Sequence, residues 1–442
     1  MRLRIALCLA GATLVCSVAS GQTTQPHQHP ATPPEPAAPA PGQQHAGHGS
    51  GQPGLFSARD SSGTAWVPDA SPMYGVEIPA GEWSVMLHGN AFVQFLNEGG
   101  TRAAQQGGSI NWAMAMARRR AASGRFGLRA MFSLEPWTIP GCGYPNLLAT
   151  GEECDGEPIH DRQHPHDLIM ELAAEYSGPL AGATRWQIYG GLAGEPALGP
   201  AAFPHRVSSM PNPLAPIAHH WLDATHITFG VVTAGVFAEQ WKVEGSVFNG
   251  REPDDDRADL DLAPLDSVAG RVSYLPTPQL ALQISAAHLE EGEAGHGTAA
   301  RVDVDRLTAS ASYQRALGQA WQWASTVAFG RNREAGRAAN ALLLETSLAL
   351  RERDTWFGRF EWAEKSAADL DVHGSDAIYD VAKLQLGYTA YFPAWSRLSP
   401  GFGGSVSVGF VPPALSPVYG HRANPGVALF LTIRPAAHHM QH

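Results

Sequence analysis

Charge is scarce in this sequence, and so are long apolar runs. Asp, Glu, Lys and Arg make up 16% of the 442 residues, against roughly a quarter in a typical soluble domain. After residue 20 no stretch reaches the ~20 apolar residues of a membrane-spanning helix. The 41 acidic residues outnumber the 30 basic ones, and phosphate contacts need a basic surface. These shortages argue against a charge-rich coiled coil, a helical membrane protein and a nucleic-acid-binding protein.

Cysteine is also rare, with four residues in the whole chain. Two of them lie in residues 1–21, where two arginines, an apolar run and small residues predict a secretory signal peptide. The other two are Cys142 and Cys154. A lone pair of cysteines in an exported protein is most simply a disulfide. Free thiols or a thiolate metal site are the alternatives.

The sequence motifs of several large enzyme classes are missing. There is no G-x-S-x-G, no H-E-x-x-H and no Walker glycine loop. We therefore expect no enzymatic activity. A loop-built hydrolase that pairs Ser208 or Ser209 with His205 is the alternative.

Histidine and proline are abundant before the first regular pattern. Residues 22–62 consist mainly of Pro, Ala, Gly, Gln and His, a composition that predicts a disordered linker. Its histidines can act as a weak metal-capture arm, or the segment can be a plain spacer. A pre-barrel segment is expected over 63–82, and a His-rich tail over 435–442. The arm histidines are His27, His29, His45 and His48.

Residues 83–434 form a series of runs in which apolar and polar residues alternate, separated by Gly, Pro, Asn and Asp. This period-two pattern predicts β-strands. The predicted strands are 83–97, 108–120, 124–134, 167–177, 184–194, 225–237, 241–250, 266–275, 279–288, 303–314, 320–331, 340–350, 355–364, 379–391, 401–411 and 425–434.

The connections between these strands alternate in length. Long loops such as 135–166, 195–224 and 332–339 follow odd-numbered strands, and mostly short turns such as 238–240 follow even-numbered ones. An even number of strands with short turns at one end is typical of bacterial outer-membrane barrels. Tryptophans near the starts of odd-numbered strands predict an interfacial girdle.

The leader, the alternating strands and the final strand GVALFLTIRP resemble outer-membrane β-barrel proteins in general. PDASPMY (68–74), HDRQHPHDLIMEL (160–172), PLAPIAHHWLDATHI (213–227) and FNGREPD (248–254) resemble a group of uncharacterised bacterial outer-membrane proteins. That resemblance implies a barrel and no particular chemistry. The His- and Pro-rich arm before a barrel is similar in composition to the copper-resistance outer-membrane protein B family, which implies a link to copper.

Histidines gather in the two longest predicted loops. Imidazole suits Cu, Zn and Ni, and carboxylate widens the choice of metal. Because both loops lie at the same end of the barrel, they can share one site for copper or another divalent transition metal. The alternative is that these side chains brace the loops by hydrogen bonding. The predicted metal ligands are His160, His164, His166, Asp167, His219, His220, Asp223 and His226.

Strand parity places charged side chains of both signs in the lumen. They can form a salt-bridged wall, or Asp167, Glu171 and Glu175 can form a carboxylate ladder along one strand face. The predicted lumen residues are Glu171, Glu175, Arg125, Arg129, Arg359 and Glu361.

The sequence therefore predicts an all-β transmembrane antiparallel barrel of about 16 strands in the bacterial outer membrane. Its expected role is channel-like passage or handling of small solutes, linked to transition-metal, and first of all copper, transport or resistance. A surface scaffold or adhesin whose long loops bind an external ligand is the alternative. Expected partners are outer-membrane lipid, small solutes or metal ions, and a periplasmic partner of the N-terminal arm.

Overall fold

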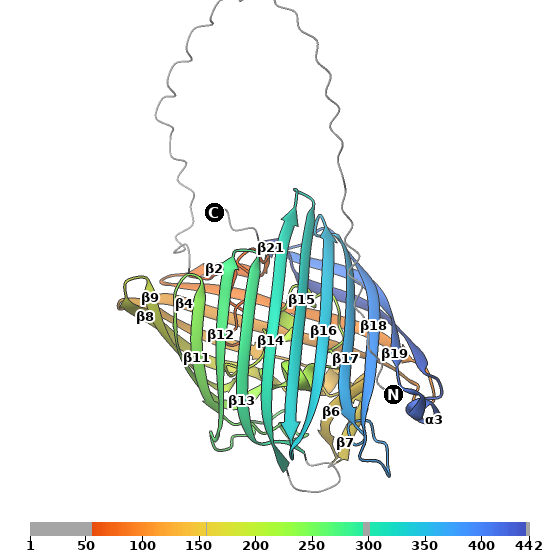
Figure 1. The fold of residues 1–442 in the computed structure, drawn as a ribbon. Coiled ribbons are helices and arrows are strands. Elements are labelled where there is room, and N and C mark those ends of the chain that lie inside the picture. Colours follow the sequence, from red (N-terminus) through yellow and green to blue (C-terminus); the bar gives the residue numbers. More distant parts are fainter. Residues whose placement is uncertain (1–54, 156, 295–300, 439–442) are drawn as a thin grey trace, which may run out of the picture. The chain divides into compact units, whose positions relative to one another are not determined.

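The computed structural model describes residues 55–155, 157–294 and 301–438 (Figure 1). Within these residues sixteen antiparallel strands pair in order along the chain and close into one barrel, since β20 pairs with β3. The predicted signal peptide and the arm histidines His27, His29, His45 and His48 lie outside the described residues.

The barrel strands have the following bounds: β3 (Trp83–Glu98), β4 (Ala104–Ala121), β5 (Gly124–Phe132), β8 (Ile169–Ala181), β9 (Thr184–Gly194), β10 (Thr228–Phe237), β11 (Trp241–Phe248), β12 (Ser267–Thr277), β13 (Leu280–Ala294), β14 (Arg301–Leu317), β15 (Trp321–Glu334), β16 (Arg337–Leu350), β17 (Asp354–Ser366), β18 (Ile378–Tyr391), β19 (Leu398–Phe410) and β20 (Ala423–Pro435).

Short elements accompany the barrel. β2 (Val76–Ala80) pairs with the first half of β3, β1 (Met73–Tyr74) pairs with β21 (Ala437–His438), and β6 (Tyr144–Cys154) forms a hairpin with β7 (Glu157–Gln163). The helical turns are α1 (Glu135–Thr138), η1 (Phe203–His205), α2 (His219–Leu222), η2 (Ala224–His226), η3 (Pro413–Leu415) and α3 (Ser416–Tyr419). Among the described residues, no helix has the length and apolar character needed to cross a membrane.

The prediction of sixteen strands is confirmed, and each predicted run coincides with one barrel strand. One predicted long loop, 332–339, is not a long loop. β15 and β16 stay paired as far as Glu334 and Arg337, and Ala335 and Gly336 make the turn with positive φ angles. The strands extend because residues 331–340 can still satisfy their backbone hydrogen bonds across the hairpin.

The wall of the barrel has an apolar outer face and a polar inner face. On β20, Val427, Leu429 and Leu431 point outward and are 48%, 61% and 61% exposed. Asn424 and Thr432 point inward and are buried. Exposed leucine, valine and phenylalanine side chains recur on the other strands. This alternation suits a barrel that contacts lipid outside and encloses polar groups.

Tryptophans lie at the end of the barrel that carries the short turns. Trp83, Trp241 and Trp321 are the first residues of β3, β11 and β15, and Trp186 and Trp356 are the third residues of β9 and β17. The rings of Trp321 and Trp356 have centres 5.9 Å apart. The predicted gathering of tryptophans at one level is therefore present, as expected of an interfacial girdle.

The lumen is filled by two segments, residues 195–227 and 55–72, which we call the plug. Most plug residues are buried, and polar contacts tie them to strands around the wall. The Arg206 guanidinium bonds Glu345 of β16 at 2.7 Å, the backbone N–H of Gly199 donates to Ser285 of β13 at 2.9 Å, and Arg118 of β4 pairs with Asp60 at 2.5 Å. In Figure 1 α3 lies at the rim of the barrel, apart from these plug segments.

Both ends of the predicted domain plan differ from the structure. Residues 55–62 fall within the predicted linker 22–62, yet Leu55 and Phe56 are 3% and 5% exposed, because their apolar side chains pack inside the barrel. Segment 63–82 contributes both to the plug and, through β2, to the wall. The predicted tail 435–442 is paired through β21, as far as it is described.

Candidate metal centre

Two loops at the end of the barrel opposite the short turns bring histidines together. His164 and His166 follow the β6–β7 hairpin and flank Pro165, whereas His219 and His220 begin α2 and His226 ends η2. Four of the five are buried, and His226 is partly buried. We call this set the histidine cluster.

Neighbouring rings of the histidine cluster have centres 5.2 to 6.2 Å apart. His226 is 5.3 Å from His166 and 5.2 Å from His219. His164 is 6.2 Å from both His219 and His220. Two imidazoles that bind one ion through nitrogens at ~2.0–2.1 Å have ring centres about 5 Å apart. The spacing around His226 therefore suits ligands that share a metal ion.

Three of these rings are held through Nδ1. His166 donates from Nδ1 to Glu135 at 2.9 Å, His219 donates to the Asp223 carboxylate at 2.9 Å, and His226 donates to the Asp223 carbonyl oxygen at 2.8 Å. An acceptor at Nδ1 fixes the tautomer and leaves the Nε2 lone pair available, as do the carboxylates and carbonyl oxygens that hydrogen-bond metal-bound histidines. The Nε2 atom of His226 is buried with no hydrogen-bond partner among the described residues.

Asp223 orients two rings and is itself held as an anion. Burial alone would raise the pKa of its carboxyl, but the Arg206 guanidinium at 2.6 Å and the His219 hydrogen bond bring that pKa well below its usual value. Asp223 therefore orients two histidine rings, and its two carboxylate oxygens are engaged by His219 and Arg206.

The histidines differ in their affinity for protons. Burial holds the pKa values of His164 and His226 well below the usual value, helped by neighbouring cationic groups and rings, and it lowers the pKa of His219 against the opposing effect of Asp223. Burial alone would also lower the pKa of His166, but Glu135 raises it above the usual value. Neutral imidazole is the form that binds metals.

His220 belongs to a second group of donors beside the first. Its Nδ1 lies 3.2 Å from Glu252 and 3.9 Å from Glu293, and the donor atoms of these three residues lie within 4.8 Å of one another. The Nε2 atom of His220 is buried without a hydrogen-bond partner in the described structure. Its spacing of 5.8 Å from His219 makes it continuous with the histidine cluster.

The remaining predicted ligands have other contacts. His164 is engaged at both nitrogens, accepting from the Glu152 backbone N–H at 3.3 Å and facing the Glu152 carboxylate at 3.3 Å. His160 contacts the Asp369 carbonyl oxygen at 3.2 Å. Asp167 faces Arg257 at 3.7 Å, and burial raises its pKa to about 7 against the effect of that arginine. The structure thus brings together His166, His219, His220 and His226, with His164 between them.

Sequence spacing did not identify the acidic partners as part of this centre. Glu135 lies in α1, Glu252 in the loop after β11, and Glu293 near the end of β13, far from the histidines along the chain. No local motif links them, because the contacts arise only in the folded barrel: Glu135 meets His166 within the 135–168 connection, and Glu252 and Glu293 meet His220 of the plug.

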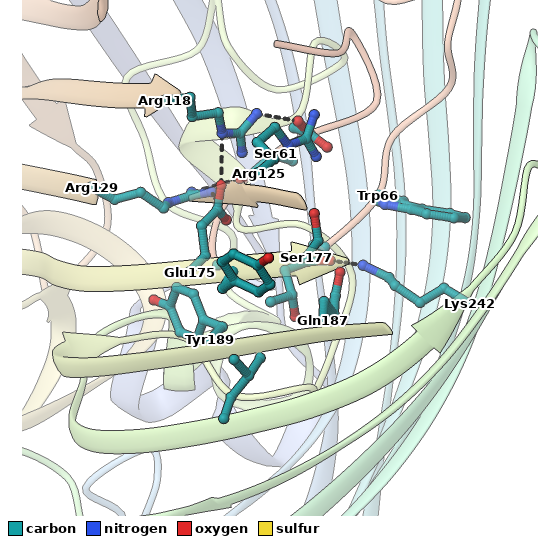
Figure 2. A pocket seen from close by; sticks show the side chains of 16 residues that line it. Ser61, Trp66, Arg118, Arg125, Arg129, Glu175, Ser177, Gln187, Tyr189 and Lys242 are labelled. Atoms are coloured by element: carbon teal, nitrogen blue, oxygen red, sulfur yellow. Dashed lines mark hydrogen bonds and ion pairs between the residues drawn. The ribbon is translucent and has the colours of Figure 1, made fainter. Parts of the chain in front are cut away.

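The predicted lumen residues line the wall and are paired. Arg129 bonds Glu171 at 2.9 Å, and Glu175 bonds Arg118 at 2.7 Å, as Figure 2 shows for Arg118, Arg129 and Glu175. Arg125 donates to the Leu55 carbonyl oxygen at 2.9 Å. This arrangement is the salt-bridged wall, and Glu171 and Glu175 do not form a free carboxylate ladder.

On the opposite wall, the remaining two predicted residues hold the plug. Arg359 donates to the Leu214 carbonyl oxygen at 2.7 Å and to Ser209 at 2.6 Å. Glu361 accepts from the Ala218 backbone N–H at 3.1 Å. Of these three contacts, the one at Ala218 directly precedes α2 and fixes where that helix begins.

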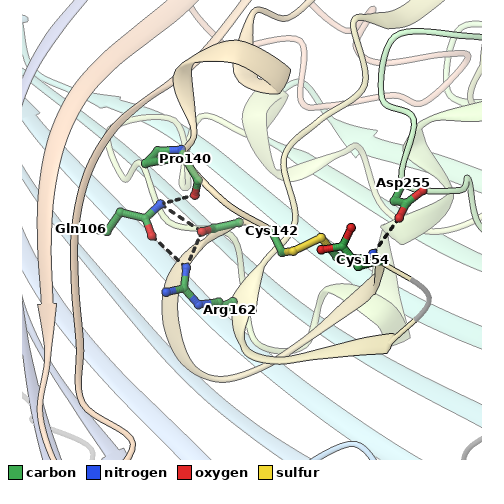
Figure 3. Close-up of a disulfide and its surroundings, with 8 residues drawn as sticks. Gln106, Pro140, Cys142, Cys154, Arg162 and Asp255 are labelled. Atoms are coloured by element: carbon green, nitrogen blue, oxygen red, sulfur yellow. Dashed lines mark hydrogen bonds between the residues drawn. A yellow bond between two sulfur atoms is a disulfide. The ribbon is translucent and has the colours of Figure 1, made fainter.

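The predicted disulfide is present between Cys142 and Cys154, whose Cα atoms are 5.7 Å apart. It joins the residues just before β6 to the end of β6, within the longest loop. Figure 3 shows it near Arg162 and Asp255. Because both sulfurs are oxidised, neither supplies a thiolate to a metal.

The serines of the hydrolase alternative are engaged elsewhere. Ser208 hydrogen-bonds Thr326 and Glu345, both at 2.9 Å, and Ser209 accepts from Arg359. The His205 ring packs on Trp112, with centres 4.6 Å apart. The structure therefore does not provide the Ser–His hydrogen bond that activates a serine nucleophile in this described part of the plug.

No protein-family model matches the chain, and no curated protein matches it. Similar solved structures include the anion-selective porin from Comamonas acidovorans, with 11% identity, 80% of this chain and 100% of that chain covered, and a TM-score of 0.48. OmpF of Salmonella typhi in complex with daunomycin has 10% identity, coverages of 81% and 100%, and a TM-score of 0.48. The outer membrane channel DcaP of Acinetobacter baumannii has 7% identity, coverages of 82% and 100%, and a TM-score of 0.45.

The assignment to the bacterial outer membrane follows from this chain's own strands. The barrel is closed, its connections are short at one end, its outer face is apolar and its inner face is polar. These are the properties of outer-membrane barrels.

Proposed function

We propose that this outer-membrane barrel binds a divalent transition-metal ion, copper first, at the histidine cluster, and that it handles this ion during passage across the outer membrane. The observation that carries the proposal is the geometry of His166, His219 and His226. Their rings lie side by side, buried for His166 and His219 and partly buried for His226, and they are anchored through Nδ1, which leaves each Nε2 for a ligand.

The donor chemistry favours a borderline ion. Imidazole suits copper, zinc and nickel, and among divalent first-row ions copper binds a given nitrogen site most tightly. The adjoining His220, Glu252 and Glu293 group adds carboxylate oxygens. An ion that reaches Glu252 can therefore be passed by way of His220 to the other imidazoles of the histidine cluster.

Because the plug fills the lumen, a role in handling a bound ion is favoured over a role as an open pore through which solutes diffuse freely. Buried hydrogen bonds and ion pairs join the plug to strands on several sides of the wall. Passage of an ion therefore requires a movement of the plug. A surface scaffold, the alternative role, would place its ligand groups on exposed loops, whereas these histidines are inside.

The test is a copper(II) titration of the purified full-length protein, followed by calorimetry near neutral pH. The triple variant with His166→Ala, His219→Ala and His226→Ala should bind copper(II) at least ~10-fold more weakly at the tightest site. Loss of a residue that only hydrogen-bonds a metal ligand already costs about 10–100-fold in affinity. The matched control removes three exposed histidines, His288, His373 and His421, of the loop-bearing end. It should leave this affinity unchanged.

Both variants carry the same N-terminal arm, so any weak binding there cancels in the comparison. Heat-modifiable migration on a denaturing gel shows whether each barrel is folded. Equal copper affinity in the wild type and in the folded triple variant would show that the histidines brace the plug. The metal function would then be withdrawn.

A further inference from the structure

The methionines of the described chain gather in one region of the lumen. Six of them pack together with Phe56, Trp112, Ile227 and Phe229, and the seventh, Met210, lines a neighbouring cavity that is shared with three of the six. The six are Met73, Met86, Met114, Met116, Met131 and Met170. They come from β1, β3, β4, β5 and β8, so distant parts of the sequence supply them.

This region departs from the polar lumen found elsewhere in the barrel. Met86 on β3 and Met116 on β4 point inward and are each 6% exposed. The corresponding inward positions of β12 carry Ser267, Arg271 and Ser273. Barrel interiors are ordinarily polar, so a group of thioethers on the inner face needs a reason.

A cavity of about 80 Å³ opens among these methionines and two histidines. A single water needs only ~10–15 Å³ by this kind of measure, so an ion fits with room for its ligands to adjust. The sulfur- and imidazole-bearing residues that line it are Met73, Met86, Met116, Met210, His88 and His205.

Two histidines line this space, and one of them has a buried nitrogen without a partner among the described residues. His88 and His205 have ring centres 5.8 Å apart, and each packs against Trp112, at 5.3 and 4.6 Å. The Nε2 atom of His88 is buried with no hydrogen-bond partner among the described residues. Burial and the nearby His88 ring hold the pKa of His205 well below its usual value, so this imidazole is neutral.

Charged groups around the cavity are already paired. The Asp60 carboxylate borders it but is bound by Arg118 at 2.5 Å. The Met210 sulfur accepts from Arg434 at 3.9 Å. The sulfur and imidazole donors left are those of Met73, Met86, Met116, His88 and His205. Met73 is only partly buried, whereas Met86 and Met116 are buried and lie opposite each other in the β3–β4 register.

We propose that this cavity is a second metal site, selective for a soft monovalent ion, Cu(I) or Ag(I), with Met86, Met116, His88 and His205 as ligands. Thioether is a soft donor that selects Cu(I) over hard or borderline divalent ions, and no free carboxylate among the lining residues competes for them. The site differs in chemistry from the histidine cluster and does not depend on the function proposed for it. A purely structural role, methionines filling irregular space, is the contrary explanation.

The test uses Ag(I), which needs no reductant, titrated calorimetrically into the full-length protein in detergent. Met86→Leu with Met116→Leu keeps the side-chain volume and removes both sulfurs, a change that cores tolerate. We expect it to weaken Ag(I) binding at least ~10-fold. The control, Met114→Leu with Met131→Leu, changes two methionines of the same apolar group that do not line the cavity. It should bind Ag(I) as the wild type does.

X-ray absorption of the silver-loaded wild type should show sulfur ligands. Unchanged Ag(I) affinity in Met86→Leu with Met116→Leu, or a spectrum without sulfur, would overturn the proposal and leave the methionines as packing. Loss of tight Ag(I) binding in the His166, His219 and His226 variant alone would overturn it as well. If that variant instead keeps Ag(I) and also keeps copper(II), the function proposed for the histidine cluster fails and this site stands.

Discussion

His166 differs from the other anchored histidines of the cluster in its preference for the proton. Its Nδ1 faces Glu135 at 2.9 Å, and this carboxylate outweighs the effect of burial on the His166 pKa, which is raised. The pKa values of His219 and His226 are lowered. As pH falls, His166 is therefore the first of the three to take up a proton.

Divalent metal binding should weaken as pH falls, and the loss should begin above the ordinary histidine pKa of about 6.5. The reason is that a proton on His166 Nε2 occupies the lone pair that the metal needs. Copper titrations between about pH 5.5 and 8.5 measure this dependence. Glu135→Gln removes the charge that raises the His166 pKa and should move the loss to lower pH. An unshifted profile in Glu135→Gln would mean that another group controls binding.

At the residue scale, the sequence identified the histidines of the centre but not their surroundings. The composition of 160–167 and 219–226 is enough to predict His166, His219, His220 and His226. Composition cannot distinguish a residue that binds a metal from one that orients such a residue, because Asp223 has a residue type that suits either role. Its role is decided by Arg206, 17 positions earlier in the chain, and by Glu345 across the lumen.

Helix α2 carries two of the five residues of the histidine cluster and depends on one close approach to the wall. A Cβ atom on Gly330 of β15 would lie 2.3 Å from the Trp221 carbonyl oxygen. The Trp221 indole N–H donates to the Ala339 carbonyl oxygen at 3.1 Å. Only glycine at 330 allows the backbone of α2 to rest against the strand in this way.

Gly330→Ala should displace α2 and weaken copper binding while the barrel itself stays folded. The added methyl group meets backbone atoms that cannot turn aside, whereas the β15 pairings on either side remain. Gly245→Ala is the matched control, because its new Cβ would have its nearest contact at 3.6 Å. Calorimetry reports the affinity, and heat-modifiable migration reports the fold. Wild-type affinity in folded Gly330→Ala protein would show that α2 does not position the centre.

At the element scale, regular structure was predictable and irregular structure was not. The strands follow from period-two alternation, since lipid outside and polar groups inside impose it on every strand. The plug has no such period, because 195–227 satisfies its backbone through contacts such as Asn212 to Gln385 at 2.7 Å. The aromatic residues Trp66 and Tyr74 indicate from the sequence that 63–80 packs against the barrel, whereas the burial of Leu55 and Phe56 was not predicted.

For the molecule as a whole, the ion pairs inside the barrel connect the wall to the plug. Arg206 links Asp223 of the plug to Glu345 of the wall, at 2.6 and 2.7 Å. Removing one partner of a buried pair costs about 3–5 kcal/mol, because the remaining charges are left buried and unpaired. Breaking a pair at the surface costs at most about 1 kcal/mol. The closed state of the lumen therefore depends on a few buried arginines.

The wild-type barrel should conduct poorly in planar bilayers, and Arg206→Ala should open it. Without the guanidinium, Asp223 and Glu345 repel each other across the contact that holds the plug, and the loosened segment admits water and ions. The barrel should stay closed as a sheet, since 195–227 supplies none of its strands. Arg251→Ala, which breaks the partly exposed pairs with Asp266 and Glu291, is the control and should conduct as the wild type does. Large conductance in the wild type, with no change in Arg206→Ala, would show that these contacts do not close the lumen, and an open channel would replace the plugged barrel as the working state.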